Sequence, residues 1–562
     1  MKKTFLLLLF SIIFISCSSD NDDPDVSGGD PSGAKGKHAF SIDFKDIAPN
    51  TSLKKSSKSL VPAFALISIT DDNGNTILTQ EKITVQKVGE KYITNEITLD
   101  TGTYNLTEFI VTNMDNAVIS VVPKTNSALS PLAEKTLPFS IKVERDKSNI
   151  TTTDNIDAEG FKPVDFGYPL LSLTFPKSTD FFSLTIDEST SITTKTIVLK
   201  SITASSYEVD WGDGTVEEYL STKSDTEEEN ELMHTYSEEN TYTVNISGPI
   251  GVVEDFSFYS NNEEGNPLQS NIVSADIGEL ALLKKCHIYL GRLSMLDTSK
   301  NLALETLTVG YNQIIGLDLT NNPKLITTQL RYNQLTDLDV SQNSNLELLN
   351  VTGNQISALD ISNNTRLEKL FVRENKLSHL NVSNNLELAW LDLSYNSLAS
   401  IDVSNNVNLR EISVGANELT NIDLSKNTNL VRIDLYENQI TAIDLSSNLI
   451  LKGLYINDNL LSNIDLSNNP EVERLFLGNN NLSSLDITNN PKIFNLGIRG
   501  NQFSGSQLDQ IITHIHEQAV LNSIMNGYME FNNNPGFEEM DPSTTDKLNE
   551  LEETYDWFFN NY

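Results

Sequence analysis

The side chains of this 562-residue chain that are best suited to hold a ligand are aromatic rings and arginines in its C-terminal half, at the predicted outward positions of short strands. Aromatic faces can stack on sugars, and arginine forks can hold carboxylates in a bidentate manner. Both residue types are also enriched where proteins contact one another. The alternative is that β propensity alone accounts for the rings. A protein or an acidic glycan would suit the candidate patch, which consists of Phe371, Arg373, Trp390, Arg432, Tyr436, Tyr455, Arg474 and Phe476.

No catalytic or metal-binding pattern accompanies these side chains. The six histidines are scattered along the chain, and no HExxH, GxSxG, P-loop or CxxC pattern is present. His514 and His516 are two positions apart on a predicted helix, so they point in different directions and do not suit a metal pair. Cys286 is predicted to pack inside the protein as a small apolar residue. We therefore expect a binding protein and no enzyme, with no catalytic residue, cofactor or metal.

The elements that position the candidate patch are sequence repeats of 21 residues. The unit reads L-x-x-L-x-L-x-x-N-x-L-x-x-L-D-L-S-x-N-x-x, which is the leucine-rich-repeat pattern, and it resembles the 21-residue repeats of internalin-like proteins. The first asparagine column is predicted to form a structural ladder whose amides satisfy buried backbone groups: Asn312, Asn333, Asn354, Asn375, Asn396, Asn417, Asn438, Asn459, Asn480 and Asn501. A second column keeps the same period: Asn301, Asn322, Asn343, Asn364, Asn385, Asn406, Asn427, Asn448, Asn469 and Asn490.

Each repeat contains two halves of the same apolar spacing, one before Asn375 and one before Asn385 in a typical coil. Each half is predicted to give a short strand with its apolar side chains pointing inward. Twenty-one residues leave no room for both a helix and a strand, so we expect a thin parallel-β solenoid over 265–503 with extended chain on both faces. Roughly eleven coils at a strand spacing of about 4.8 Å predict a length of about 50 Å. Residues 504–562 resemble the α/β C-terminal cap of secreted bacterial leucine-rich-repeat proteins.

An aspartate column follows the second half of the repeats and has two possible explanations. Carboxylates about 5 Å apart repel one another, so each requires a partner. A Ser or Thr two residues later can provide a local hydrogen bond, and calcium bridging between coils is the alternative. Asn381 replaces the aspartate in one coil, and the column consists of Asp276, Asp297, Asp318, Asp339, Asp360, Asp402, Asp423, Asp444, Asp465 and Asp486.

Two β modules are predicted before the repeats. Residues 37–165 alternate apolar and polar residues in short runs, which favours a β-sandwich, loosely similar to transthyretin-like or immunoglobulin-like modules. The second module, 170–250, contains the run Asp210-Trp211-Gly212-Asp213-Gly214-Thr215 and then His234-Thr235-Tyr236. These motifs resemble those of PKD-type immunoglobulin-like domains, which implies a spacer. The predicted fold class is thus mostly β, with two N-terminal β-sandwich modules before the solenoid and its cap.

The N-terminus indicates the compartment. Lys2 and Lys3 precede an apolar run that is too short to span a bilayer, so residues 1–17 read as a secretory signal. Phe14-Ile15-Ser16-Cys17 resembles a lipobox, which implies lipidation of Cys17. Residues 18–36 read as a flexible acidic linker, similar to the export tag of surface lipoproteins of Bacteroidetes-type bacteria. That resemblance implies a lipid anchor in the outer membrane and exposure at the cell surface.

The formal net charge of −38 disfavours nucleic acid as a partner. Three functions remain for a monomeric surface protein of this kind. The first is a receptor or adhesin that binds a macromolecule, foremost a protein, through its repeats. The second is an accessory glycan-capture lipoprotein of a polysaccharide-uptake system, and the third is a structural role in the envelope.

Overall fold

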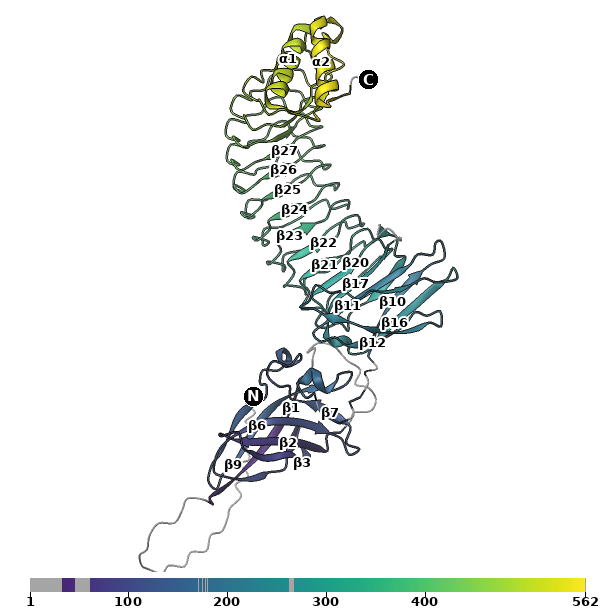
Figure 1. Ribbon diagram of the computed structural model, residues 1–562, viewed down its shortest axis with the longest axis vertical. Coiled ribbons are helices and arrows are strands. Elements are labelled where there is room, and N and C mark those ends of the chain that lie inside the picture. Colours follow the sequence, from purple (N-terminus) through teal and green to yellow (C-terminus); the bar gives the residue numbers. More distant parts are fainter. Residues whose placement is uncertain are drawn as a thin grey trace, which may run out of the picture.

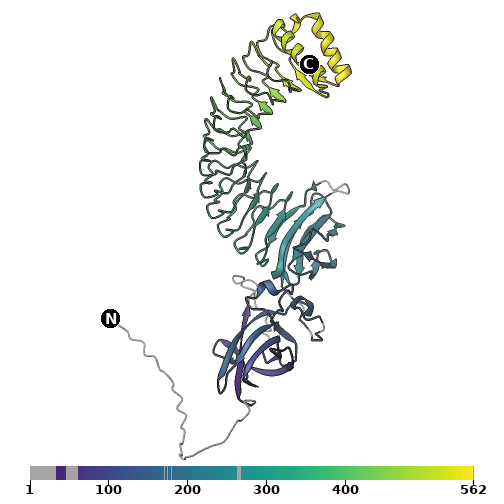
Figure 2. The same ribbon diagram turned by 60° about the vertical axis from the view of Figure 1, so that its left-hand side comes forward.

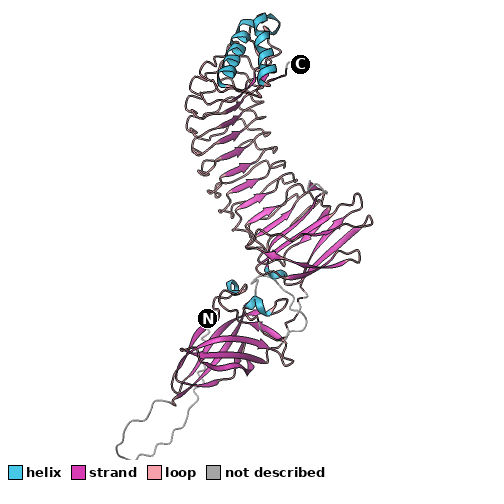
Figure 3. Cartoon of the chain, in the orientation of Figure 1, coloured by secondary structure: helices cyan, strands magenta, loops and turns pink. Residues whose placement is uncertain are grey.

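A computed structural model describes residues 33–45, 61–169, 171–173, 175–176, 178, 180–261 and 267–560. Figure 1 shows three parts along the chain: a first β unit, a second β unit, and an arc of repeats that ends in two helices. The fold is mostly β, and Figure 3 shows the longer helices only at the C-terminal end of the arc. No helix of the described residues is long and apolar enough to cross a membrane. The lipidation site Cys17 and residues 1–32 lie outside the described residues.

The first unit is one sheet that closes on itself, in place of the predicted sandwich of two sheets. Consecutive pairings run β2–β3–β4–β1–β9–β7–β6, and β6 pairs again with β2. Alternating apolar residues predict strands, but they do not predict which strands pair. Here β2 pairs with β3 on one side and with β6 on the other, which closes the sheet. Lys35 and Gly36, at the end of the predicted linker 18–36, belong to the first strand. The strands are β1 (Lys35–Lys45), β2 (Phe64–Asp71), β3 (Thr76–Val88), β4 (Lys91–Thr94), β5 (Ile97–Asp100), β6 (Gly102–Thr112), β7 (Val118–Val121), β8 (Phe139–Val143) and β9 (Ser148–Asp157), with short 3-10 helices η1 (Ser130–Leu132) and η2 (Pro163–Phe166).

The second unit has two facing sheets with a buried aromatic core. The first sheet has the order β13-β12-β16-β10-β19, and β11 pairs with β14, β15 and β17 in the second. Trp211 is fully buried in the cluster between them, and the Tyr236 and Tyr242 rings stack at 3.9 Å. Gly212 has φ +79°, and a Cβ there would lie 2.5 Å from the Thr243 carbonyl oxygen, so this turn requires glycine. The elements are β10 (Phe181–Asp187), β11 (Lys195–Ser201), β12 (Ser206–Asp210), β13 (Val216–Leu220), β14 (Thr222–Lys223), β15 (Leu232–His234), β16 (Thr241–Ser247), η3 (Ile250–Val252), β17 (Val253–Asn261), β18 (Pro267–Leu268) and β19 (Ile272–Asp276).

The second unit and the solenoid share a sheet and a core. β17 pairs in parallel with β20 (Lys285–Ile288), the first strand of the solenoid, and β19 pairs with β10. β17 lies in the interval 251–264 that the predicted boundaries of 250 and 265 left unassigned. One cluster of buried side chains extends from Trp211 through the repeats to Trp557. The second unit therefore covers the N-terminal end of the solenoid, and the two share one continuous core.

The repeats form one strand per coil, and only the half before the first asparagine contains it. This corrects the expectation of a strand in each half, because on the other side consecutive coils are joined by single bonds such as that from Gln334 N to Ile314 O, 2.9 Å. Tight turns follow, for example from Asn343 N to Val340 O. The strands line the concave side of the arc (Figure 2). They pair in parallel at a shift of 21 residues and are β21 (Thr306–Thr308), β22 (Thr327–Gln329), β23 (Leu348–Asn350), β24 (Lys369–Phe371), β25 (Trp390–Asp392), β26 (Glu411–Ser413), β27 (Arg432–Asp434), β28 (Gly453–Tyr455), β29 (Arg474–Phe476) and β30 (Asn495–Gly497).

The C-terminal segment closes the last coil with helices and two further parallel strands. Helix α1 (Gly505–Asn522) begins after Ser504, whose side chain accepts from Gln507 N, and it buries Leu508, Ile511, Ile512 and Ile515. Helix α2 (Pro542–Tyr555) begins after Asp541. The short strands β31 (Tyr528–Glu530) and β32 (Phe558–Phe559) extend the sheet beyond β30, and η4 (Phe537–Glu539) precedes α2.

The first asparagine column is hydrogen-bonded at both ends of its amide. Asn375 Oδ1 accepts from Ile356 N at 2.9 Å, and its Nδ2 donates to the carbonyls of Val351 and Val372 at 2.9 and 3.1 Å. Ile356 and Val351 belong to the preceding coil, so each amide joins two coils. The other nine members repeat this arrangement, including the last one, Asn501, whose Oδ1 accepts from Leu482 N. The first column thus forms the predicted structural ladder.

Candidate functional site

Three-residue strands place the candidate patch on the concave sheet. The middle residue of each strand is buried, and in most strands both neighbours are at least partly exposed, as with Leu370 between Lys369 and Phe371. Successive strands stack equivalent residues in register, so Lys369 lies beside Trp390 and Phe371 beside Asp392. The lysine ammonium lies 4.7 Å from the centre of the Trp390 ring. The outward positions of neighbouring coils therefore act together as one surface.

Five of the eight predicted residues surround one hollow of about 370 Å³. Phe371, Arg373, Trp390, Arg432 and Tyr436 line it. The hollow spans strands β24 to β27, and Leu391 and Ile412, the buried middle residues of β25 and β26, also line it. The remaining side chains that line it are Asp392, Glu411, Ser413 and Asp434.

Arg432 is held in place by a carboxylate and an aromatic ring. Its Nε and Nη2 donate to Asp434 at 3.0–3.1 Å, and its guanidinium lies 4.5 Å from the centre of the Tyr455 ring. Burial raises the pKa of the Asp434 carboxyl, and the hydrogen bonds and charge of Arg432 oppose this rise. The arginine side chain is therefore fixed in place before a ligand binds. Its Nε and Nη2 donors are already used by Asp434.

Arg373 is fixed in a similar way from the other side of the hollow. Its guanidinium lies 4.4 Å from the centre of the Tyr395 ring and donates from Nη1 to the Tyr436 hydroxyl at 3.2 Å. Its Nε lies 3.1 Å from Glu374 Oε1. The Tyr436 ring in turn lies against Gly415, where a Cβ would approach the ring to 2.5 Å. A glycine at that position is what allows the ring to lie flat on the neighbouring coil.

The other three predicted residues lie further along the arc, toward the cap. Tyr455 and Phe476 stack with their ring centres 5.1 Å apart. Phe476 lines a second hollow of about 310 Å³ that includes Arg499 and Glu530. Arg474 lies over the Phe494 ring at 5.0 Å and 3.8 Å from Glu473. The candidate patch is thus divided between a central hollow and a stacked pair beside it.

The predicted patch leaves out the three carboxylates of the central hollow. Asp392, Glu411 and Asp434 occupy the same outward columns as the predicted arginines and aromatics, but the patch contains only residues of those two kinds. Two guanidinium groups face these three carboxylates. An anionic ligand would be repelled here, and an acidic glycan fits this hollow poorly.

The aspartate column has local partners. Asp318 Oδ1 accepts from the N–H and the hydroxyl of Thr320 at 2.9 and 2.6 Å, and these bonds lower the pKa of the Asp318 carboxyl. The pKa of Asp360 is lowered in the same way by Ser362. No group of three or more metal-ligating side chains is found in the described part of the chain. Burial raises the pKa of the Cys286 thiol to about 12, which makes it a poor nucleophile.

The parallel register, the 21-residue period and the asparagine ladder define the chain as a leucine-rich-repeat protein. No family model and no curated protein matches the sequence. Among solved structures, it is similar to the functional domain of InlJ from Listeria monocytogenes, with 22% identity over 53% of this chain and 78% of that one and a TM-score of 0.36. An internalin (inlF) from the same organism has 20% identity over 52% and 86% and a TM-score of 0.45. A leucine-rich-repeat protein of Leptospira interrogans has 24% identity over 42% and 66% and a TM-score of 0.41.

Proposed function

We propose that this chain is a surface receptor or adhesin that binds a protein ligand in the central hollow of its concave sheet. The observation that carries the proposal is the convergence of Trp390, Tyr436 and the two arginines on one hollow. Trp, Tyr and Arg are the residues that most often dominate protein–protein affinity. Stacking and ion pairing hold these side chains in place, so little rotamer freedom remains to be lost on binding.

The proposal includes a lipid anchor at Cys17 and a place on the outer face of a bacterial outer membrane. It rests on the sequence of the N-terminus alone. The PKD-type nature of the second unit, a monomeric state and the absence of catalysis belong to the same proposal. Capture of an acidic glycan is the weaker alternative at this hollow because its carboxylates outnumber its arginines, and a structural envelope role would leave the hollow without a use.

The test is a pull-down from protease-accessible surface proteins with the full chain and with the double variant Trp390→Ala/Tyr436→Ala. We expect specific capture by the unchanged chain and at least a tenfold loss for the variant, because each truncation removes an anchor worth about 2 kcal/mol or more. Leu386→Ala is the control, since Leu386 is exposed on the same coil but lies outside the strand. Equal capture by all three proteins would contradict the proposal.

A further inference from the structure

A third hollow, the junction hollow, lies where the second unit meets the first coils of the solenoid. Its volume is about 470 Å³. One wall comes from the loop between β10 and β11 and from the segment before β19, and the other comes from three consecutive coils. The residues that line it are Thr190, Ser191, Gln269, Asn271, Gly291, Arg292, Tyr311, Asn312, Gln313 and Tyr332. None of them belongs to the candidate patch.

This junction hollow contains no carboxylate among its lining residues, in a chain of formal net charge −38. The central hollow contains three, and the hollow near the cap contains Asp458 and Glu530. The lining of the junction hollow offers amides, hydroxyls and one guanidinium. Nη1 of that guanidinium, Arg292, lies 3.2 Å from Asp187 Oδ2. The site is therefore polar, rich in paired donors and acceptors, and close to neutral.

Two tyrosines provide an aromatic platform beside these polar groups. Tyr311 and Tyr332 stack with ring centres 4.7 Å apart and an interplanar angle of 24°. They are 36% and 38% exposed, and because Tyr332 lies between Tyr311 and Gly353, the surface open to a ligand is the part of the Tyr311 ring turned away from Tyr332 and the edge of the Tyr332 ring. Tyr332 lies on Gly353, where a Cβ would come within 2.4 Å of the ring. The Arg331 guanidinium lies 5.2 Å from the centre of the Tyr311 ring and forms no ion pair with the described residues.

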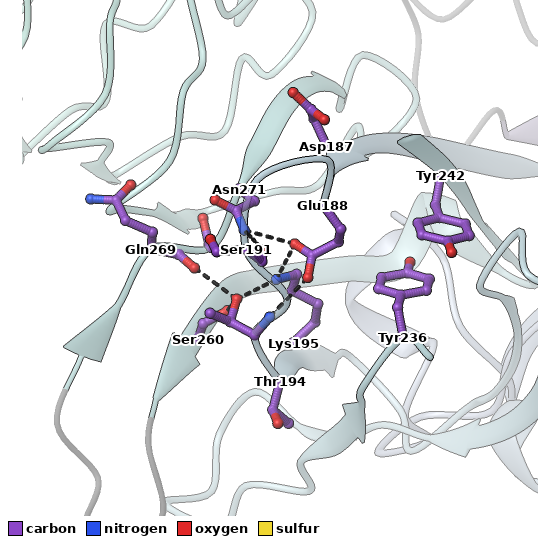
Figure 4. A network of polar contacts seen from close by, with 12 residues as sticks. Asp187, Glu188, Ser191, Thr194, Lys195, Tyr236, Tyr242, Ser260, Gln269 and Asn271 are labelled. Carbon is purple, nitrogen blue, oxygen red and sulfur yellow. Dashed lines mark hydrogen bonds and ion pairs between the residues drawn. The ribbon is translucent and has the colours of Figure 1, made fainter. Parts of the chain in front are cut away.

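A buried ion pair holds the loop wall of the hollow in place. Lys195 and Glu188 are both fully buried, 2.6 Å apart, and Figure 4 shows the network that surrounds them. Asn271 Nδ2 donates to Glu188 Oε1 and to the Ser191 carbonyl, both at 2.8 Å. Thr193 N donates to Glu188 Oε2 at 2.8 Å, and the Thr193 hydroxyl donates to the Gln269 carbonyl at 2.9 Å. Burial is the main cause that lowers the pKa of Lys195.

Such a pair is costly to bury unless its hydrogen bonds are satisfied. Here those bonds fix three residues of the lining: Ser191, Gln269 and Asn271. The hollow therefore has a rigid polar wall opposite the tyrosine platform. A preformed site with few, fixed polar groups and an aromatic wall is typical of small-ligand sites.

We propose that the junction hollow is a saccharide-binding site. A sugar ring presents an apolar C–H face, which the exposed part of the Tyr311 ring, supported by Tyr332, can cover, and an edge of hydroxyls that both donate and accept. Amides such as those of Gln269 and Gln313 do the same, so each sugar hydroxyl can be paired. Because no carboxylate lines the hollow, a uronate would not be repelled there, so both neutral sugars and uronates can bind. This inference uses residues distinct from those of the central hollow and does not depend on the proposed function.

The test is binding of the full chain to a printed array of neutral and uronate-containing oligosaccharides, followed by titration of the best soluble binder. We expect a saturable interaction that Tyr332→Ala weakens at least tenfold. Gln313→Ala, which removes an exposed amide with little risk to folding, is expected to weaken it about threefold to tenfold. The neutral and uronate arms of the array identify the class of sugar.

Tyr395→Ala is the matched control. Tyr395 occupies the same column as Tyr332, with φ +56° and 40% exposure, but it lies beside Arg373 at the central hollow. Retained affinity in this variant supports the proposal. Absence of any array binding would overturn it, and so would a loss caused by Tyr395→Ala but by neither Tyr332→Ala nor Gln313→Ala.

Discussion

The two asparagine columns of the solenoid share a residue type and a period of 21, but their hydrogen bonding differs. In the first column both ends of each amide are paired, as at Asn438, where Oδ1 accepts from Leu419 N. In the second column Nδ2 donates to two carbonyls of the preceding coil, as Asn427 does to Val403 and Asn406. The Oδ1 atom there is buried with no partner among the described residues. This holds for Asn301, Asn343, Asn364, Asn385, Asn406, Asn427, Asn448, Asn469 and Asn490.

Asn322 is the exception in the second column, and it explains the others. Its Oδ1 accepts from the Thr298 hydroxyl at 2.8 Å. The residue equivalent to Thr298 in the later coils is apolar, as with Val340 and Val382. Asparagines with the same period therefore need not have the same hydrogen bonds, because the neighbouring coil determines which donors face each side-chain amide. A buried unpaired acceptor costs about 1–3 kcal/mol.

The largest expected effect separates the two columns directly. Asn438→Ala leaves the Leu419 N–H without its partner, so we expect a loss of about 3–4 kcal/mol in the free energy of unfolding. Asn427→Ala leaves no such orphan, because Asn406 N and Leu409 N still donate to the two carbonyls, and it removes an unpaired oxygen. Its expected cost is about 1–2 kcal/mol. Urea unfolding followed by circular dichroism measures both, and equal losses would contradict the difference between the columns.

A smaller effect follows from supplying the missing donor. Val382→Thr places a hydroxyl where Thr298 has one, facing the unpaired Oδ1 of Asn406, and we expect a free energy of unfolding within about 0.5 kcal/mol of the parent's or above it. The matched change Val372→Thr faces Asn396, whose Oδ1 already accepts from Leu377 N. It should cost about 1–3 kcal/mol, as an unpaired buried hydroxyl does. If both variants lose the same stability, the unpaired Oδ1 atoms do not lower the stability contributed by the second asparagine column.

The reverse change tests the exception itself. Thr298→Val removes the one hydroxyl donor in this series, which makes Asn322 like its neighbours. We expect a loss of about 1 kcal/mol, measured in the same urea titrations. A gain in stability would mean that the hydroxyl at 298 costs more to bury than its bond returns.

The smallest expected effects concern the outer aspartate column. Because hydrogen bonds lower the pKa of Asp318 and Asp360 in the folded chain, these groups stabilise the fold above the unfolded pKa of about 4, and this contribution is lost as the pH falls through the folded pKa. Asp360→Asn should reduce that acid sensitivity slightly, since Asn381 already makes the same bond to Ser383 N.

Adding EDTA should leave the melting temperature within a few degrees of its value without the chelator, because the aspartates of the column have local hydrogen-bond partners. A larger drop with EDTA would restore the calcium alternative.

The repeats could be predicted closely from the sequence because every coil has the same spacing of apolar residues and asparagines. The period gave the register of β20 to β30, and the outward columns gave five residues that meet in the central hollow. The pairing of Arg432 with Asp434 was not predictable. The period shows which residues occupy equivalent positions, but it does not determine the side-chain rotamers at those positions. β17 was missed for a related reason: it lacks the repeat pattern, although it is the strand that joins the second unit to the solenoid. The closure of the first sheet through β2 and β6 depends on contacts far apart in the sequence, which alternation does not reveal.

The central claim, that the hollow between β24 and β27 contacts a protein ligand, can be tested directly by site-specific photo-cross-linking on intact cells. The photoreactive amino acid replaces Ser413, which lines the hollow, or Leu386 on the same arc outside it. We predict a ligand adduct from position 413 that is absent from position 386 and is lost in the Trp390→Ala background. No adduct at 413, or adducts of equal yield at both positions, would contradict the claim.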